Sequence, residues 1–402
     1  MPKTVAIICE YNPFHNGHLY QINKIREELG SDTEIIGIMS GNYTQRGESA
    51  IADKFVRAKC AVNAGVNLIL ELPFPFSSLS AELFARSAVH IANSINVVDY
   101  LSFGSESGNL DELLSVASAM ATKEFEEQIA MISKNNKGMG YPEKMELALS
   151  KVIKQNDFTL TPNNILAIEY LKSLKSSKSS ITPHTVKRKG ASFDEVNITS
   201  SELQSATAIR NYLSELDISA LEYIPEYSKS LYLDELANGN FPCSLSRLST
   251  AILSSLRLNL HPNPDLIPDT QGGLYNRLKS KALEATDLDT LLHLTETKVY
   301  TKARVRRAIL YSFLGVTSSE TKEAPLYTQV LAMDTIGKAI LKKIGKDSEI
   351  TILTKPSKVE ALSQRAMAQW ELNFRADSVF QITKPKSADG RLSLMTSPYV
   401  KK

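Results

Sequence analysis

Cysteine is scarce in this chain of 402 residues: its three cysteines, Cys9, Cys60 and Cys243, are far apart. Such spacing excludes a disulfide framework and a CxxC metal site, and it suits a reducing compartment, so we expect a cytoplasmic protein. The chain also lacks a signal-peptide pattern at its start and any apolar run long enough to cross a bilayer. No membrane role is therefore expected.

A strong net charge is absent as well. The formal net charge of +2 provides no overall attraction to nucleic acid or anionic lipid, so an RNA partner would have to be bound by local patches. Hydrophobic residues make up 43% and charged residues 22% of the chain, as in ordinary globular proteins. Because single cores seldom grow beyond roughly 250 residues, we expect more than one domain.

Short apolar runs alternate with helix-period segments in the first hundred residues. The predicted strands are 5–8, 34–39, 67–72 and 98–103, and the predicted helices between them are 19–29, 55–62 and 79–92. This alternation predicts an α/β fold with a Rossmann-like, doubly wound parallel sheet. Such sheets bind ligands at the carboxyl ends of their strands.

Three domains are expected along the chain. A helical stretch at 110–174, a strand at 181–187 and a helix near Ala206 complete the first domain, 1–215. Residues 216–318 show the pattern of several helices and form the predicted helical domain. Residues 319–402 predict a small α/β C-terminal module, with strands at 326–333, 349–353 and 378–382.

The segment Glu10-Tyr11-Asn12-Pro13-Phe14-His15-Asn16-Gly17-His18 joins the first predicted strand to the first predicted helix. A helix N-terminus provides unpaired N–H donors and a positive dipole end, which suit a polyphosphate. Two imidazoles around a glycine can both donate hydrogen bonds to phosphate oxygens that gain charge in a transition state. We therefore predict His15 and His18 as the catalytic residues.

Competing phosphate and metal motifs are missing. The chain contains no GxxxxGK[ST] sequence, no GxGxxG after the first strand and no HExxH pattern. We accordingly predict no metal ligands among the protein side chains, and we expect Mg²⁺ to arrive with ATP.

The histidine segment resembles the HxGH signature of the nucleotidyltransferase superfamily. A second superfamily element, a Ser/Thr-rich turn followed by Ile-Arg, resembles Ser205-Ala206-Thr207-Ala208-Ile209-Arg210. Hydroxyl groups at a helix start cap N–H groups or bind phosphate, and an arginine can hold phosphate through its planar fork. Ser205, Thr207 and Arg210 are therefore candidate phosphate contacts, and an ordinary helix cap beside a surface arginine is the alternative.

Further stretches resemble one family, the bacterial tRNA(Met) cytidine acetate ligases. They are EYNPFHNGH at 10–18, MSGNYTQRGESAIADKFVRA at 39–58, LILELPFPF at 68–76, LSFGSE at 101–106, TPNNILAIEYL at 161–171 and KRKGAS at 187–192. The resemblance implies that acetate and ATP form acetyl-adenylate with release of pyrophosphate. It also implies transfer of the acetyl group to the wobble cytidine of elongator tRNA(Met), with the helical domain as the tRNA platform.

The resemblance also implies which residues bind ATP. They are Ile7, Cys9, Glu10, Tyr11, Asn12, Pro13, Phe14, Asn16, Gly17 and Tyr20 in the first segment, then Gly104, Asn163 and Arg188. Without the resemblance, Gly104 fits a turn glycine, Asn163 a helix cap and Arg188 a solvated surface charge.

Basic residues supply the candidate RNA or phosphate contacts. The polar segment after the second strand contributes Arg46, Lys54 and Arg57, while Glu71 has no assigned role. Two clusters follow: Lys172, Lys175, Lys178, Lys187, Arg188 and Lys189, then Lys298, Lys302, Arg304, Arg306 and Arg307. A solvated helix face is the alternative for each cluster. Tyr43 and Phe76 are candidate stacking partners for an unstacked base.

Three other functions remain open from the residues alone. A small-molecule adenylyltransferase would need less than half of this chain. A relative of class I aminoacyl-tRNA synthetases would use Lys355-Pro356-Ser357-Lys358 as its second ATP signature. A non-catalytic RNA-binding scaffold would not require intact His15, Gly17 and His18.

Overall fold

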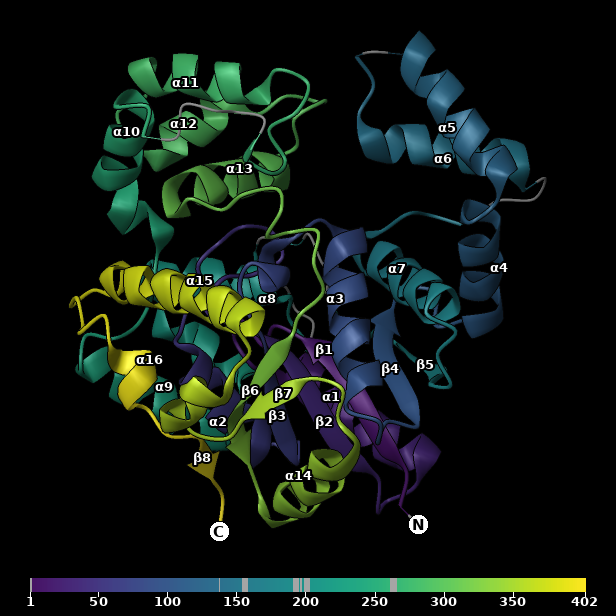
Figure 1. The fold of residues 1–402 in the computed structure, drawn as a ribbon, viewed down its shortest axis with the longest axis vertical. Helices are drawn as coiled ribbons and strands as arrows, with labels where there is room; N and C mark the ends of the chain where they lie inside the picture. Colours follow the sequence, from purple (N-terminus) through teal and green to yellow (C-terminus); the bar gives the residue numbers. More distant parts are fainter. Residues whose placement is uncertain are drawn as a thin grey trace.

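A mixed sheet forms the centre of the molecule in the computed structural model, which describes residues 2–136, 138–153, 158–190, 195, 197–198, 203–260 and 266–402. Within these residues the strand order is β5–β4–β1–β2–β3–β6–β7, with β8 beside β6 (Figure 1). The strands are β1 (Thr4–Cys9), β2 (Glu34–Ser40), β3 (Leu68–Leu72), β4 (Tyr100–Ser105), β5 (Thr182–Lys187), β6 (Tyr327–Met333), β7 (Thr351–Leu353) and β8 (Tyr399–Val400). Strands β1 to β5 are parallel, which confirms the predicted doubly wound sheet.

Helices cover both faces of this sheet because its strands bury side chains on both sides. Ala6, Ile36 and Leu68 pack with the helices α3 (Ala81–Ser94) and α7 (Pro162–Ser176). Val5 and Ile35, one position away along the same strands, pack with α1 (Asn16–Leu29) and α2 (Lys54–Asn63) on the other face. The order also reverses at β1, since β2 and β4 flank it, and ligands bind at such switch points.

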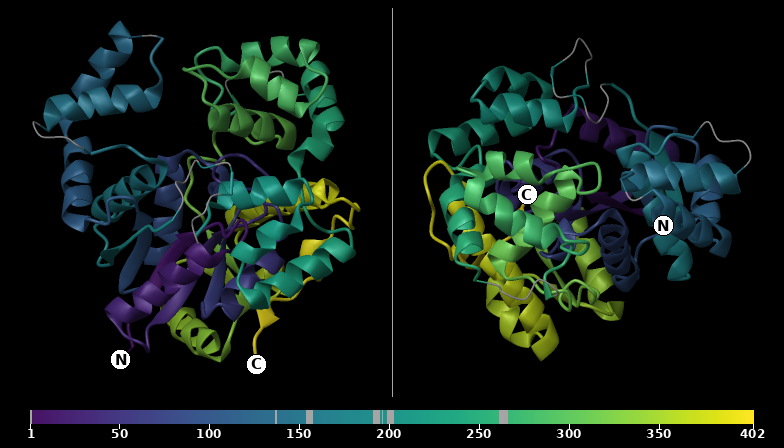
Figure 2. Two further views of the ribbon diagram at one scale, coloured as in Figure 1. Left: turned by 180° about the vertical axis from the view of Figure 1, so that it is seen from behind. Right: turned by 90° about the horizontal axis from the view of Figure 1, so that it is seen from above.

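Two groups of helices rise beyond the carboxyl ends of β1 to β5 (Figures 1 and 2). One consists of α4 (Leu110–Met120), α5 (Lys123–Asn135) and α6 (Tyr141–Val152). The other consists of α10 (Ser249–Arg257), α11 (Leu274–Glu284), α12 (Leu288–Thr295) and α13 (Lys302–Leu314). They meet where the backbone of Gly140 faces the carbonyl of Lys298, since an added Cβ would lie 3.0 Å from that oxygen. Helix α8 (Ala206–Ser214) lies between the second group and the sheet, and α9 (Glu226–Ala237) packs against α2.

The C-terminal part extends the same sheet. Strand β6 pairs antiparallel with β3, and β7 and β8 pair parallel with β6. The helices of this part are α14 (Thr335–Asp347), α15 (Gln364–Phe380) and α16 (Leu392–Met395). The boundary at residue 319 stays a sequence prediction, but strands from both sides of it form one sheet.

The predicted strand at 378–382 is wrong. Ser363 caps α15 by accepting the N–H of Ala366, and the helix continues to Phe380 before a short 3₁₀ turn, Gln381–Thr383. Its buried residues include Ala366, Leu372, Ala376 and Phe380, a helical spacing that overrides the strand preference of the short run Ser-Val-Phe-Gln-Ile. Across the described residues, no helix combines the length and the apolar character that a membrane crossing requires.

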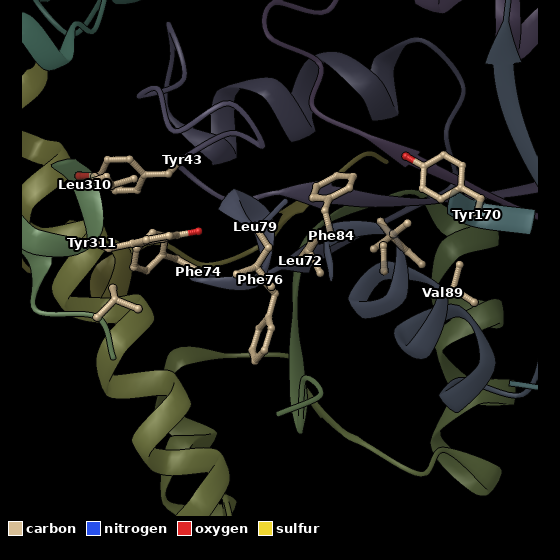
Figure 3. Close-up of a cluster of buried hydrophobic side chains, with 14 of the residues drawn as sticks. Tyr43, Leu72, Phe74, Phe76, Leu79, Phe84, Val89, Tyr170, Leu310 and Tyr311 are labelled. Atoms are coloured by element: carbon tan, nitrogen blue, oxygen red, sulfur yellow. The ribbon is translucent and has the colours of Figure 1, made fainter. Parts of the chain in front are cut away.

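A buried hydrophobic cluster connects the second helical group to the sheet. Tyr43 follows β2, Phe74 and Phe76 follow β3, and Tyr311 comes from α13 (Figure 3). The Tyr311 hydroxyl donates a hydrogen bond to the carbonyl of Ser78. Because Tyr43 and Phe76 are fully buried here, they are not exposed stacking surfaces for a nucleobase, contrary to the sequence prediction.

A buried ion cluster connects α2, β3 and α15. Lys54 Nζ lies 2.7 Å from a Glu71 oxygen and 2.6 Å from an Asp377 oxygen, and Asn42 donates to Asp377 at 2.8 Å. Burial alone would lower the pKa of Lys54, but Asp377 and Glu71 outweigh it and raise the pKa above its usual value. Burial raises the pKa of Asp377 to about 6, although Lys54 opposes the shift.

We expect Lys54→Met to reduce the free energy of unfolding by about 3–5 kcal/mol, because two carboxylates would lose their buried cation. Lys343→Met is the matched control. Lys343 also joins the C-terminal part to an N-terminal strand, 3.0 Å from Glu34, but it is half exposed. We expect this control to cost less than about 1 kcal/mol. Urea unfolding measures both, and equal losses would contradict a special role for the buried cluster.

Candidate active site

The turn that follows β1 places two histidines at the start of α1. His15 is the N-cap residue: its backbone is extended, and its ring Nδ1 accepts the N–H of Gly17 at 3.0 Å. In return, the N–H of His15 donates to Nδ1 of His18 at 3.2 Å. This reciprocal pair is a capping box in which imidazoles replace the usual hydroxyl and carboxylate groups.

These two hydrogen bonds determine which nitrogen of each ring carries the proton. Because Nδ1 of His15 and Nδ1 of His18 both accept from the backbone, a neutral ring must carry its proton on Nε2. The ring centroids are 3.9 Å apart, so the two Nε2–H groups are close neighbours. The motif thus provides a pair of neutral N–H donors at a helix N-terminus.

Burial keeps these rings neutral. It lowers the pKa of His15 to about 3, and the charges of Arg188 and Arg210 add to the shift. Burial likewise lowers the pKa of His18 well below its ordinary value, with His15 and Arg188 contributing. Gly17 is required here because a Cβ would lie 2.7 Å from Cε1 of His15 and displace the ring.

A pocket opens in front of the two rings. Among the predicted residues it brings together His15, Gly17, His18, Tyr20, Gly104, Lys187 and Arg188. Arg188 lies over Gly104, since a Cβ there would be 3.4 Å from Arg188 Cγ. The sequence did not single out Gln21, Val186 or Gln204, which also line the pocket, and it assigned Lys189 only to a basic cluster. Ala191 and Ser192, at the end of the KRKGAS stretch, lie outside the described residues.

Asn163 does not line this pocket. Its amide donates to Glu106 at 2.6 Å, and the other Glu106 oxygen accepts from the Thr161 hydroxyl at 2.7 Å and from the Asn164 N–H at 3.1 Å. Thr161, not Asn163, is the N-cap residue of α7. Glu106 thus ties the start of α7 to the end of β4, a role that the sequence did not predict.

Most other residues of the first segment support the turn from inside the protein. Their side chains are buried or turned away from the pocket: Ile7, Cys9, Tyr11, Asn12, Pro13 and Phe14. Asn12 accepts the N–H of Ile51 at 2.7 Å, and Glu10 accepts the N–H of Gln45 at 2.8 Å. Burial raises the pKa of Glu10, and the bond from Gln45 opposes this shift. Asn16, the first residue of α1, is half-buried.

The second superfamily element lies beside this turn. Ser205 caps α8: its hydroxyl accepts the N–H of Ala208 at 2.9 Å and donates to the carbonyl of Glu195 at 2.6 Å. Arg210 donates to the carbonyl of Asn12 at 2.8 Å and to the Thr207 hydroxyl at 3.2 Å. The structure therefore brings Arg210 to the histidine turn, whereas Ser205 acts as a helix cap.

Arg57, a predicted RNA or phosphate contact, is buried. Its guanidinium donates to the carbonyls of Glu10 and Ser40, at the ends of β1 and β2, and to those of Gly41 and Ala52. It stabilises the loops at the carboxyl edge and does not face solvent. Lys54 is equally inaccessible, in the ion cluster with Glu71 described above, so neither residue is exposed for RNA contact.

The residues of each predicted basic cluster do not form one surface. Lys175 and Lys178 lie at the end of α7, just before β5 begins, at the edge opposite the pocket, whereas Lys187 ends β5 beside it. On α13, Arg304 donates to the carbonyls of Asp269 and Gln271, Arg307 pairs with Asp269, and Arg306 pairs with Glu48. Lys302 is exposed, and Arg46 lies in the loop near Glu10.

Lys355-Pro356-Ser357-Lys358 lies away from the histidines. It follows β7, which runs parallel to β6 and therefore opposite to β1. Its strand accordingly ends at the other edge of the sheet. This position argues against a second ATP signature of the synthetase type.

Comparisons with known proteins agree with this geometry. The family model of HIGH nucleotidyl transferases matches residues 2–393. A tRNA(Met) cytidine acetate ligase from Thermoanaerobacter sp. (strain X514) is 38% identical over 375 residues, covering 92% of both chains. Another, from Clostridium perfringens, is 35% identical over 400 residues, covering 94% of this chain and 95% of the other. This chain belongs to the tRNA(Met) cytidine acetate ligase family.

Two solved structures extend the family comparison to the whole fold. The crystal structure of Thermotoga maritima TmcAL without ligand has a TM-score of 0.91 at 29% identity, covering 99% of each chain. The same protein bound with alpha-thio ATP has a TM-score of 0.90, also at 29% identity and 99% coverage. The tRNA(Met) cytidine acetate ligase family thus includes a member of the same fold that binds an ATP analogue.

The lowered pKa of His15 gives a direct test of the site. We expect its imidazole to stay neutral between pH 5 and pH 8, well above its pKa of about 3, whereas a free histidine titrates near pH ~6.5. NMR spectra of protein labelled with ¹⁵N-histidine should show a constant Nε2–H pattern for His15 over this range. A titration midpoint near neutrality would contradict the proposed hydrogen bonding of the two rings.

Proposed function

We propose that this chain is a tRNA(Met) cytidine acetate ligase, the activity for which its relatives are named. In the first step an acetate oxygen attacks the α-phosphorus of ATP, the bond to the pyrophosphate oxygen breaks, and acetyl-adenylate remains. In the second step the exocyclic amine of the wobble cytidine in elongator tRNA(Met) attacks the acetyl carbon. AMP leaves, the amine releases a proton, and N(4)-acetylcytidine is formed.

The observation that carries this proposal is the pair of Nε2–H donors at the start of α1. Adenylation needs no enzyme nucleophile, because acetate itself attacks; it needs alignment and donors around the α-phosphate. Neutral His15 and His18 supply these donors without a proton-transfer step of their own. The helix N-terminus adds its unpaired N–H groups and positive dipole end.

Other residues around the turn are proposed to bind the remaining parts of ATP. Gly104 and Arg188, at the ends of β4 and β5, are proposed to contact adenosine, with Asn163 acting through Glu106. Arg210, held against the Asn12 carbonyl with its tip near Thr207, is proposed to bind the outer phosphates.

Magnesium is proposed to enter on the phosphates of ATP. Among the described residues, no three His, Cys, Asp or Glu side chains are grouped so that they could hold a metal ion. Mg²⁺ usually keeps several waters and takes its remaining ligands from phosphate oxygens, so a protein cage is unnecessary.

The size of the match supports a large substrate. The relatives are similar over the helical and C-terminal parts as well as the sheet, whereas a small-molecule adenylyltransferase needs only the first part. Four exposed lysines at the carboxyl edge and on the second helical group are proposed to contact tRNA phosphates: Lys187, Lys189, Lys298 and Lys302.

A labelled-acetate assay tests the proposed reaction. With ATP, Mg²⁺ and ¹⁴C-acetate, we expect label in elongator tRNA(Met) and release of pyrophosphate. The control transcript carries uridine at the wobble position and should stay unlabelled, because it lacks the exocyclic amine. Chelation of Mg²⁺ should stop the reaction. Turnover that needs only a phosphorylated small molecule would favour an adenylyltransferase instead.

His15→Asn separates chemistry from folding. Asparagine is a good N-cap residue, so α1 and the melting temperature should be preserved, but the Nε2–H donor is lost. We expect kcat for tRNA acetylation to fall by about 10²- to 10³-fold, the usual effect of removing one such donor. His293→Asn, at an exposed position of α12, is the matched control and should have no effect. Full activity of His15→Asn would refute the donor role.

A further inference from the structure

Arg46 lies at the tip of a tight turn that follows β2. The N–H of Gly47 donates to the carbonyl of Thr44 at 2.9 Å, and the N–H of Thr44 donates to the carbonyl of Glu48, also at 2.9 Å. Gly47 has a positive φ of 75°, the conformation that closes a three-residue loop of this kind. The turn thus presents Arg46 at a fixed point of the backbone.

Contacts on three sides hold the turn in place. Glu10, the residue after β1, accepts the N–H of Gln45 at 2.8 Å, and the Gln45 amide donates to the carbonyl of Leu79 at 3.0 Å. On the other side of the tip, Glu48 pairs with Arg306 of α13. The tip is therefore anchored to the end of β1, to the loop before α3 and to the second helical group.

The charge of Arg46 acts on the same groups as the charge of Arg210. Burial raises the pKa of Glu10, whereas the charges of Arg210 and Arg46 lower it. Burial lowers the pKa of Arg210, and Arg46 adds to that shift although Glu48 and Glu10 oppose it. The two guanidinium groups thus lie close enough to repel each other. With Arg306 they outnumber the two glutamates, so this end of the site favours an anion.

The order of the strands indicates which part of ATP meets these two arginines. Along the sheet, β4 and β5 lie on one side of β1, and β2 lies on the other. Gly104 and Arg188, the proposed adenosine contacts, come from the side of β4 and β5, and the histidines follow β1. A nucleotide that has its adenosine at Gly104 and its α-phosphate at the histidines therefore directs its outer phosphates towards β2, where Arg46 lies.

We propose that Arg46 is a catalytic residue that binds the leaving pyrophosphate together with Arg210, an inference that rests on the proposed function. As an acetate oxygen bonds to the α-phosphorus, the bond from that phosphorus to the bridging oxygen breaks, and its electron pair stays on pyrophosphate. A planar guanidinium donates two parallel hydrogen bonds to phosphate oxygens and stabilises this charge. The sequence alone allowed RNA or phosphate as the partner of Arg46, and its place beside Arg210 favours phosphate.

A comparison of two nucleotides tests this assignment without any turnover. ATP carries the outer phosphates and AMP does not, so Arg46→Gln should weaken the binding of ATP alone. By calorimetry with Mg²⁺ and without tRNA, we expect the Kd for ATP to rise at least about tenfold, equivalent to about 1.4 kcal/mol, and the Kd for AMP to stay within about twofold. Arg46→Lys keeps the charge but loses the planar fork, so its Kd for ATP should lie between the two.

The labelled-acetate assay adds the kinetic readout. We expect kcat of Arg46→Gln to fall about 10²- to 10³-fold, the usual effect of removing one donor that stabilises developing charge. Arg86→Gln, at an exposed position of α3, is the matched control and should behave as the original protein in both measurements.

Two results would overturn the assignment. If Arg46→Gln raises KM for tRNA and leaves the Kd for ATP unchanged, Arg46 binds RNA instead. If the Kd for AMP rises as much as the Kd for ATP, the substitution has disturbed the turn and no outer-phosphate contact is shown. If the melting temperature shows that Arg46→Gln does not fold, Arg46→Lys takes its place and must weaken ATP but not AMP. Failure of the original protein to acetylate tRNA would instead refute the proposed function, and the two Kd values do not depend on that reaction.

Discussion

Two backbone N–H groups at the start of α1 determine the chemistry available at this site. They occupy Nδ1 of His15 and of His18, so each neutral ring has one remaining N–H, and both of these belong to Nε2. A helix start normally satisfies its first N–H groups with hydroxyl or carboxylate side chains. Here the capping groups are the rings of His15 and His18, the candidate catalytic residues. The first helical turn therefore aligns the two donors as it folds.

The surroundings keep that turn in place from several directions. Arg57 gathers carbonyls at the ends of β1 and β2, and Arg210 holds the carbonyl of Asn12. Gly47 (φ +75°) comes so close to α13 that a Cβ would lie 2.7 Å from the N–H nitrogen of Arg307, which brings the helical region over the loop. The buried guanidinium groups of Arg57 and Arg210 thus act as hydrogen-bond donors to backbone carbonyls.

The sequence predicted the parts of the fold that depend on local periodicity. Apolar runs and helix-period segments gave β1 to β5 and the helices between them because burial on both faces leaves a continuous pattern. The histidine motif and Gly104 were found for the same reason, since the motif follows β1 and Gly104 lies at the end of β4. Lys54 was predicted as an RNA or phosphate contact because one of its ionic partners is not local: Asp377 lies 323 positions away along the chain. A local sequence pattern cannot reveal a contact between residues so far apart along the chain.

The antiparallel pairing of β3 with β6 has a consequence for how the protein is made. Leu70 lies beside Val330, so the sheet that carries the histidine turn gains its neighbouring strand only after most of the polypeptide has been translated. Asp377, one of the two ionic partners of Lys54, is made later still. During synthesis on the ribosome, the early strands would expose an unpaired edge, a condition that favours aggregation or chaperone capture. The sheet that carries the histidine turn is therefore completed only when β6 has been made.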